Sequence, residues 1–191
     1  MAEVLLFHHA LGLTDGVRAF ADGLRAAGHA VSTPDLYDGD TFDSITDGVA
    51  NAQQIGFDTV IERGVSCADG LGDRLLVAGF SLGVLPAQKL AQTRPGVRGA
   101  VLYHSAVPPE MFGGRWPDGV ALQMHIADGD EFAAEDMEAI DALSSANGGP
   151  GELYIYESSG HLVADSSWRE YDAALYGLML ERTLAFLATH G

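Results

Sequence analysis

The pentapeptide GFSLG at residues 79–83 constrains the fold of this chain more than any other stretch. The apolar run at residues 75–78 predicts a buried strand, and residues 82–93 predict a helix. A strand that turns directly into a helix leaves one residue strained and exposed, and flanking glycines remove the side chains that would collide there. The pentapeptide therefore matches a G-x-S-x-G nucleophile elbow with Ser81 as the nucleophile. The alternative is a strand-to-helix turn that happens to carry a serine, but the flanking elements favour the elbow.

Strand and helix patterns alternate along the rest of the chain. Further strands are predicted by apolar runs at residues 4–8, 29–33, 97–103, 120–126 and 153–156. Helices are predicted at residues 14–27, with Thr14 as N-cap, at about 48–67 and at 132–143. The last helix is expected to begin at Ser167, because residues 167–170 fit an S-x-x-E capping box. Pro86 is expected to distort the helix after the elbow.

This alternation predicts an α/β fold in which a mostly parallel sheet of about six to seven strands carries helices on both faces. No repeat or linker interrupts the chain, so we expect a single domain over residues 1–191. The irregular stretch at 107–119 and the acidic loop at 36–47 carry no element pattern.

Composition limits the partners of the protein. Ten basic and 27 acidic residues give a formal net charge of −17, which repels phosphate backbones and anionic membranes. We therefore expect neither nucleic acid nor membrane partners, and a monomer or homodimer. The single cysteine, Cys67, excludes an intramolecular disulfide framework. The first apolar run is too short for a signal peptide, so we expect a cytoplasmic protein.

A serine hydroxyl needs a neighbouring base, usually a histidine held by an acid. In this architecture the order along the chain is serine, acid, histidine, each just beyond the carboxyl end of a strand. His161 follows the last predicted strand and is the expected base; the alternative is a loop histidine that caps the last helix. The loop at 127–130 offers two acids, Asp128 and Asp130, and position alone does not separate them.

Five segments resemble the dienelactone hydrolase family of α/β-hydrolases. They are LFHHALG at 6–12, TPDLY at 33–37, GFSLG at 79–83, HIADGD at 125–130 and GHLVAD at 160–165. The resemblance implies an α/β-hydrolase fold without a large lid domain and without a cofactor. The family's H-x-G-x-x-D pattern falls on residues 125–130 and favours Asp130 as the acid. The resemblance also implies that the backbone N–H groups of Leu82 and Ala10 form the oxyanion hole.

The sequence departs from the family at several positions. The best-known members carry cysteine at the elbow, where this chain has Ser81, and a further glycine where it has Val84. The family's acidic residue in the early loop corresponds to His9, and its carboxylate-binding arginine corresponds to Asp165. An aspartate would repel a substrate carboxylate, so we expect neutral esters to be better substrates than dienelactone. Arg115 is the candidate to replace the arginine.

Histidines near the carboxyl ends of the strands raise the question of a metal. His8, His9 and His104 lie there, but adjacent residues of a strand point to opposite faces, so His8 and His9 do not readily share an ion. We expect no metal, and we expect His9, His104 and Arg115 to contribute to substrate binding.

These observations favour a cofactor-free serine hydrolase that cleaves a small carboxylic ester, lactone or thioester through an acyl-enzyme. The alternatives are a lyase or perhydrolase that uses the same three residues, and a binding protein that keeps the fold without turnover.

Overall fold

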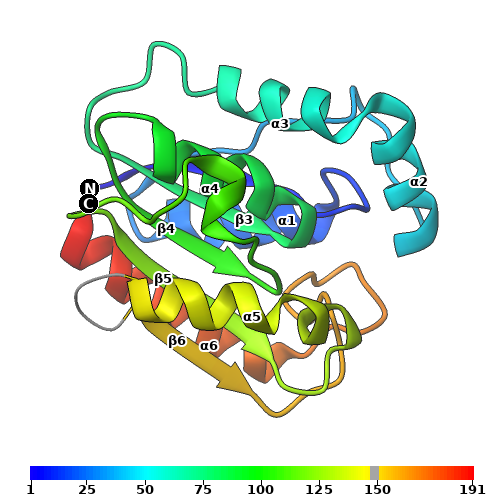
Figure 1. Ribbon diagram of the computed structural model, residues 1–191. Helices are drawn as coiled ribbons and strands as arrows, with labels where there is room; N and C mark the ends of the chain where they lie inside the picture. Colours follow the sequence, from blue (N-terminus) through cyan, green and yellow to red (C-terminus); the bar gives the residue numbers. More distant parts are fainter. Residues whose placement is uncertain (147–150) are drawn as a thin grey trace.

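A single parallel sheet organises the computed structural model, which describes residues 1–146 and 151–191 (Figure 1). The described strands are β1 (Glu3–Phe7), β2 (Ala30–Ser32), β3 (Leu75–Phe80), β4 (Val97–Tyr103), β5 (Ala121–Ala127) and β6 (Glu152–Tyr156). They lie in the order β2-β1-β3-β4-β5-β6, and every neighbouring pair is parallel. The predicted strand number and arrangement are confirmed.

Helices cover both faces of the sheet, because alternate residues of each buried strand face opposite sides. The helices are α1 (Asp15–Ala26), α2 (Ile45–Ile55), α3 (Phe57–Ser66), α4 (Val84–Thr93), α5 (Glu131–Ala146) and α6 (Ala173–His190). One core packs α1 and α6 against Leu76 and Ala78 of β3. The other packs α3, α4 and α5 against Leu75 and Val77 of the same strand. In the described part of the chain, no helix is long and apolar enough to cross a membrane.

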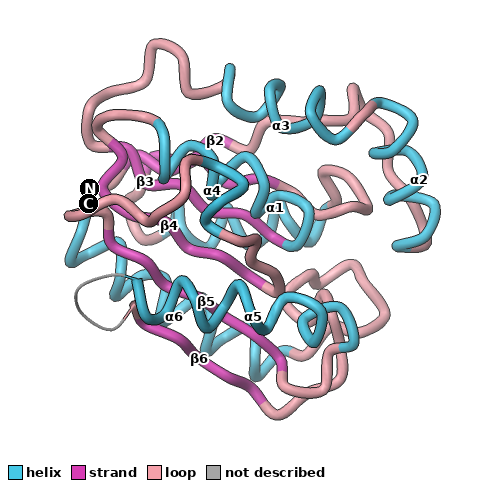
Figure 2. The backbone as a smooth tube through the Cα atoms, viewed as in Figure 1, coloured by secondary structure: helices cyan, strands magenta, loops and turns pink. Residues whose placement is uncertain are grey.

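The loops that carry functional residues gather where the strands end. Figure 2 shows these loops on the side of the sheet opposite the two chain ends. The first helix begins as predicted, because the Thr14 side chain accepts a hydrogen bond from the Val17 N–H. The segment predicted as one helix to about residue 67 is two helices, α2 and α3, which meet at Gly56 with φ of 92°.

The predicted start of the last helix is wrong. Helix α6 begins at Ala173, and its N-cap Asp172 accepts hydrogen bonds from two backbone N–H groups in the first turn. The residues of the apparent capping box have tertiary partners instead: the Ser167 hydroxyl donates to Asp165, and the Glu170 carboxylate accepts from the His161 N–H. Residues 167–170 therefore form a loop at the functional edge of the sheet.

The predicted distortion at Pro86 is also not seen. Pro86 is the third residue of α4, in the first turn, where helical N–H groups lack an intrahelical acceptor and proline is tolerated. Its ring lies against Gly64 of α3, where an added Cβ would be 2.5 Å from the Pro86 Cβ. Pro86 thus contributes to the packing between α3 and α4.

Candidate active site

The pentapeptide at 79–83 forms a sharp turn from β3 into a short 3₁₀ helix, Ser81–Gly83, that leads into α4. Ser81 has φ of 48°, in the left-handed region that side-chain-bearing residues rarely adopt. A Cβ on Gly79 would lie 2.1 Å from the Gly83 carbonyl oxygen, and one on Gly83 would lie 2.6 Å from the carbonyl oxygens of Phe7 and His8. Both glycines are therefore required, and the predicted elbow conformation is confirmed.

The Ser81 side chain lies within hydrogen-bonding distance of a histidine, and that histidine is in turn bonded to an aspartate. Its Oγ is 2.7 Å from Nε2 of His161, and Nδ1 of His161 is 2.6 Å from Oδ2 of Asp130. His161 and Asp130 are 5% and 2% exposed. With Asp130 ionised, the Nδ1–H of His161 donates to it, so Nε2 is free to accept the Ser81 hydroxyl proton. The structure therefore assembles the three predicted residues in the geometry of a nucleophile, a base and an orienting acid.

Only one of the two candidate acids contacts the histidine. Asp130 also accepts a hydrogen bond at Oδ1 from the Phe132 N–H, 3.0 Å away, which fixes the carboxylate at the start of α5. Asp128 is exposed, and its Oδ1 accepts from the Ser158 N–H at 3.2 Å. Asp128 therefore links the loop after β5 to the segment after β6. The carboxylate that is oriented toward His161 is that of Asp130.

Two contacts around His161 were not predicted from the sequence. The Glu170 carboxylate accepts from the His161 backbone N–H at 2.9 Å. The Phe132 ring lies against the imidazole, with 4.6 Å between ring centroids. The sequence pattern places Glu170 in a helix cap and Phe132 at the start of a helix. Both side chains restrict the orientation of His161.

The two predicted oxyanion donors lie on neighbouring loops. The contact of Gly83 with the carbonyls of Phe7 and His8, where β1 ends, brings the elbow, including Leu82, against the loop that holds Ala10. Ala10 is 3% exposed, and on its far side a Cβ on Gly48 of α2 would lie 2.0 Å from the Ala10 carbonyl oxygen. Helix α2 therefore packs directly on the backbone of this loop.

The structure corrects the predicted substrate-binding role of His9. His9 is 1% exposed; its Nε2 is 2.7 Å from Oδ2 of Asp165, and its Nδ1 accepts from the Leu11 N–H at 3.3 Å. Both ring nitrogens are thus occupied by protein partners. Burial alone would raise the pKa of Asp165, but hydrogen bonds from His9, Ser167 and Thr14 outweigh it and lower the pKa to about 2. Asp165 is a buried, ionised partner of His9.

The other two predicted binding residues differ in their exposure. His104 is fully buried at φ of 66°, neither ring nitrogen has a hydrogen-bond partner in the described structure, and burial holds its pKa well below the usual value. The Arg115 side chain is 76% exposed and its nearest carboxylate is Asp118. The Arg115 carbonyl accepts from Gln92 near the end of α4, so the structure does not bring Arg115 to Ser81.

The side chains of the two adjacent histidines have different partners. His9 bonds to Asp165, whereas Nε2 of His8 accepts from the Leu36 N–H at 3.0 Å. Across residues 1–146 and 151–191, no three His, Cys, Asp or Glu side chains are grouped as metal ligands would be.

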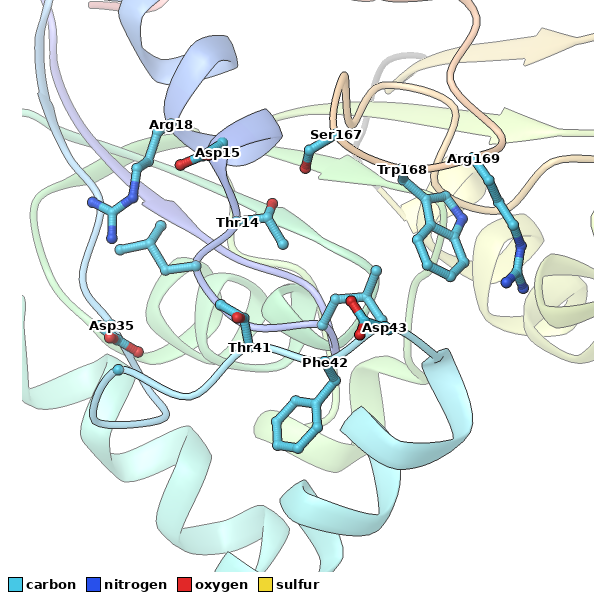
Figure 3. A pocket seen from close by; sticks show the side chains of 13 residues that line it. Thr14, Asp15, Arg18, Asp35, Thr41, Phe42, Asp43, Ser167, Trp168 and Arg169 are labelled. Carbon is cyan, nitrogen blue, oxygen red and sulfur yellow. The ribbon is translucent and has the colours of Figure 1, made fainter.

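A cavity of about 560 Å³ lies beside the loop that follows β1 (Figure 3). Its wall carries three carboxylates, two guanidinium groups and two aromatic rings, contributed by Asp15, Asp35, Asp43, Arg18, Arg169, Phe42 and Trp168. Leu11, directly after Ala10, also lines it, whereas Ser81, Asp130 and His161 do not. The volume is in the range of small-molecule sites, and Leu11 places the cavity next to the loop of the candidate active site.

A parallel sheet with a sharp turn from strand to helix after β3 is typical of the α/β hydrolases, and solved structures share the overall fold. A dienelactone hydrolase-like promiscuous phosphotriesterase from metagenomic libraries aligns with a TM-score of 0.78 at 18% identity, over 100% of this chain and 87% of the other. The dienelactone hydrolase from Anabaena variabilis aligns with a TM-score of 0.69 at 15% identity, over 100% and 87% of the two chains. At such identities the similarity shows the fold alone.

The sequence matches the dienelactone hydrolase family over residues 1–191, and the chain therefore belongs to this family. It is a hydrolase of the class that acts on ester bonds. No curated protein matches the sequence significantly. The family resemblance expected from the five sequence segments is confirmed.

Proposed function

We propose that the protein is a cofactor-free serine hydrolase that cleaves a small, neutral carboxylic ester, lactone or thioester through an acyl-enzyme. The observation that carries the proposal is the chain of hydrogen bonds from Ser81 through His161 to Asp130, at 2.7 and 2.6 Å. A hydroxyl activated in this way is the nucleophile of acyl-transfer enzymes on several unrelated folds.

The reaction uses each side chain in turn. Ser81 Oγ attacks the carbonyl carbon while Nε2 of His161 accepts the hydroxyl proton, and the imidazolium is stabilised by Asp130. The developing oxyanion accepts hydrogen bonds from the backbone N–H groups of Leu82 and Ala10. His161 then protonates the leaving oxygen or sulfur. A water molecule attacks the acyl-Ser81 ester and gives its proton to His161, which returns it to Ser81 and releases the acid.

We still expect neutral substrates to be preferred over anionic ones, but for a different physical reason. Asp165 is buried and bonded to His9, so direct repulsion of a substrate by an exposed Asp165 does not apply. Two other observations support the preference. No arginine contacts Asp165 or His9 in the described structure. The lining of the adjacent cavity carries three carboxylates and two guanidinium groups. This lining favours a neutral or hydroxylated group over a second carboxylate.

The test combines turnover with covalent labelling. The purified protein is assayed with neutral aryl esters, thioesters, neutral lactones and an anionic lactone, and is then treated with a fluorophosphonate and analysed by mass spectrometry. We expect a burst with the aryl ester, a higher kcat/KM for neutral than for anionic substrates, and a label on Ser81.

The matched variant for this test is Ser81→Ala. It should lose the label and roughly ten-thousandfold or more in kcat with an unchanged circular dichroism spectrum. A label on another residue would refute Ser81 as the nucleophile. Absence of both burst and turnover on every substrate would favour the binding-protein alternative. Turnover only in the presence of peroxide would favour a perhydrolase, and turnover without hydrolysis products would favour a lyase.

A further inference from the structure

A second histidine–aspartate pair lies next to the candidate catalytic one. In the first pair, Nδ1 of His161 bonds to Asp130 and Nε2 accepts from a hydroxyl. In the second, the roles of the nitrogens are exchanged: Nε2 of His9 is 2.7 Å from Asp165, and Nδ1 accepts from the Leu11 N–H. Because Nδ1 is an acceptor, His9 carries its proton on Nε2 and donates it to the carboxylate.

The Asp165 carboxylate is held by four donors, counting His9. The Thr14 hydroxyl donates to Oδ2 at 2.6 Å, and the Ser167 N–H and hydroxyl donate to Oδ1 at 2.7 and 2.6 Å. Gly16 of α1 leaves the space for this carboxylate, because an added Cβ would be 1.6 Å from Oδ1. Asp165 is therefore a fixed, ionised anchor that joins α1 to the loop before α6.

Through His9, this anchor holds the backbone directly after Ala10. The Leu11 N–H donates to Nδ1 of His9, and the His9 carbonyl accepts from the Gly12 N–H at 3.1 Å and from Nδ1–H of His8 at 2.8 Å. On the opposite side, Gly48 of α2 contacts the Ala10 carbonyl. The peptide units on both sides of Ala10 are thus fixed, and with them the direction of the Ala10 N–H.

We propose that His9, anchored in the wild type by Asp165, is a positioning residue whose Nδ1 holds the Leu11 N–H so that the Ala10 N–H faces the oxyanion formed at the Ser81 site. This inference rests on the proposed function, because only an acyl-transfer site uses that N–H. His9 and Asp165 do not touch the reacting atoms; they act through the loop. A donor misplaced by a fraction of an ångström loses much of its effect on the transition state and little of its effect on the bound substrate.

Two substitutions of His9 separate the two hydrogen bonds. In His9→Asn, the side-chain oxygen occupies the place of Nδ1 and keeps the acceptor for the Leu11 N–H. In His9→Gln, the side-chain amide occupies the place of Nε2 and keeps the bond to Asp165 but loses that acceptor. We expect His9→Gln to lower kcat about tenfold to hundredfold with KM within about threefold of wild type, and His9→Asn to retain most of kcat.

A second readout does not depend on turnover. Amide hydrogen exchange, followed by NMR, should show a protected Leu11 N–H in wild type and in His9→Asn, and faster exchange in His9→Gln. The matched control is Tyr103→Phe, which removes a buried hydrogen bond to Thr183 on the α1–α6 side of the sheet and should lower the melting temperature without changing kcat.

The outcomes distinguish this inference from the function on which it rests. No turnover in the wild type would overturn both. Turnover in the wild type with equal kcat for His9→Gln and His9→Asn, or with Leu11 exchange equal in the two variants, would overturn the positioning role alone. A loss in His9→Gln that appears in KM with kcat unchanged would assign His9 to substrate binding and would also overturn it.

Discussion

Five histidine side chains of this protein are buried: His8, His9, His104, His125 and His161 are each 5% exposed or less. His161 could be predicted from its place after the last strand, because the chain order of an α/β hydrolase requires a base there. The role of His9 could not, because its partner Asp165 is 156 positions away. A sequence pattern reports local periodicity, whereas this pair is created by the meeting of two loops at one edge of the sheet.

At the residue scale, the clearest prediction concerns the two acids of the loop after β5. Asp130→Asn should lower kcat about ten-thousandfold, because an amide neither stabilises the imidazolium nor fixes the Nδ1–H tautomer of His161. Asp128→Asn should stay within a few-fold of wild type, since the Asp128 carboxylate accepts from the Ser158 N–H and the carboxylate bonded to His161 is that of Asp130. Steady-state kinetics of both variants, with their melting temperatures as the control for folding, test this. A larger kcat loss in Asp128→Asn would reverse the assignment.

At the scale of elements, the last helix shows where sequence patterns fail. Residues 167–170 satisfy the spacing of a capping box, yet helix α6 begins at Ala173. The side chains that would form the box have stronger partners in Asp165 and the His161 N–H. Partly buried, charge-assisted hydrogen bonds outweigh a helix cap, which contributes about 1 kcal/mol. Strands were predicted well because continuous apolar runs in a parallel sheet require no distant partner.

The docking of α2 on the loop after β1 leads to a second prediction. Gly48→Ala should lower kcat by about tenfold or more, because the new Cβ would be 2.0 Å from the Ala10 carbonyl oxygen and must displace the loop or the helix. Alanine itself favours a helix interior by about 1 kcal/mol, so loss of helix propensity is not the cause.

Gly177→Ala in α6 is the control for this substitution, since a Cβ there meets no atom within 4 Å. It should leave kcat unchanged and slightly raise the melting temperature. Kinetics of the two variants measured side by side decide the matter. Equal kcat values in Gly48→Ala and wild type would mean that α2 does not govern the loop that carries Ala10.

At the scale of the whole molecule, the buried histidines make the free energy of unfolding depend on pH. Burial lowers the pKa of His8 to about 4 and that of His125 to about 3, and it also lowers the pKa of His104. Removal from water disfavours the charged form of each ring, and for His8 this outweighs the Asp35 carboxylate 3.9 Å away. An unfolded chain exposes them to water, where the ordinary pKa of histidine is about 6.5.

Stability should therefore fall as the pH drops below about 6.5, well before the carboxylates titrate. Between that pH and about 4 the unfolded chain binds more protons than the folded one, so the free energy of unfolding decreases with falling pH. His8 and His125 each account for up to about 3 kcal/mol over this range. Asp165 adds a further loss below about pH 4, because its pKa of about 2 in the folded protein is below the ordinary value of 3.8.

Urea denaturation at about pH 7 and about pH 4.5 measures the difference in the free energy of unfolding. His125→Gln removes one titrating ring and should flatten the dependence, whereas equal unfolding free energies at the two pH values in the wild type would show that these rings take up protons in the folded state.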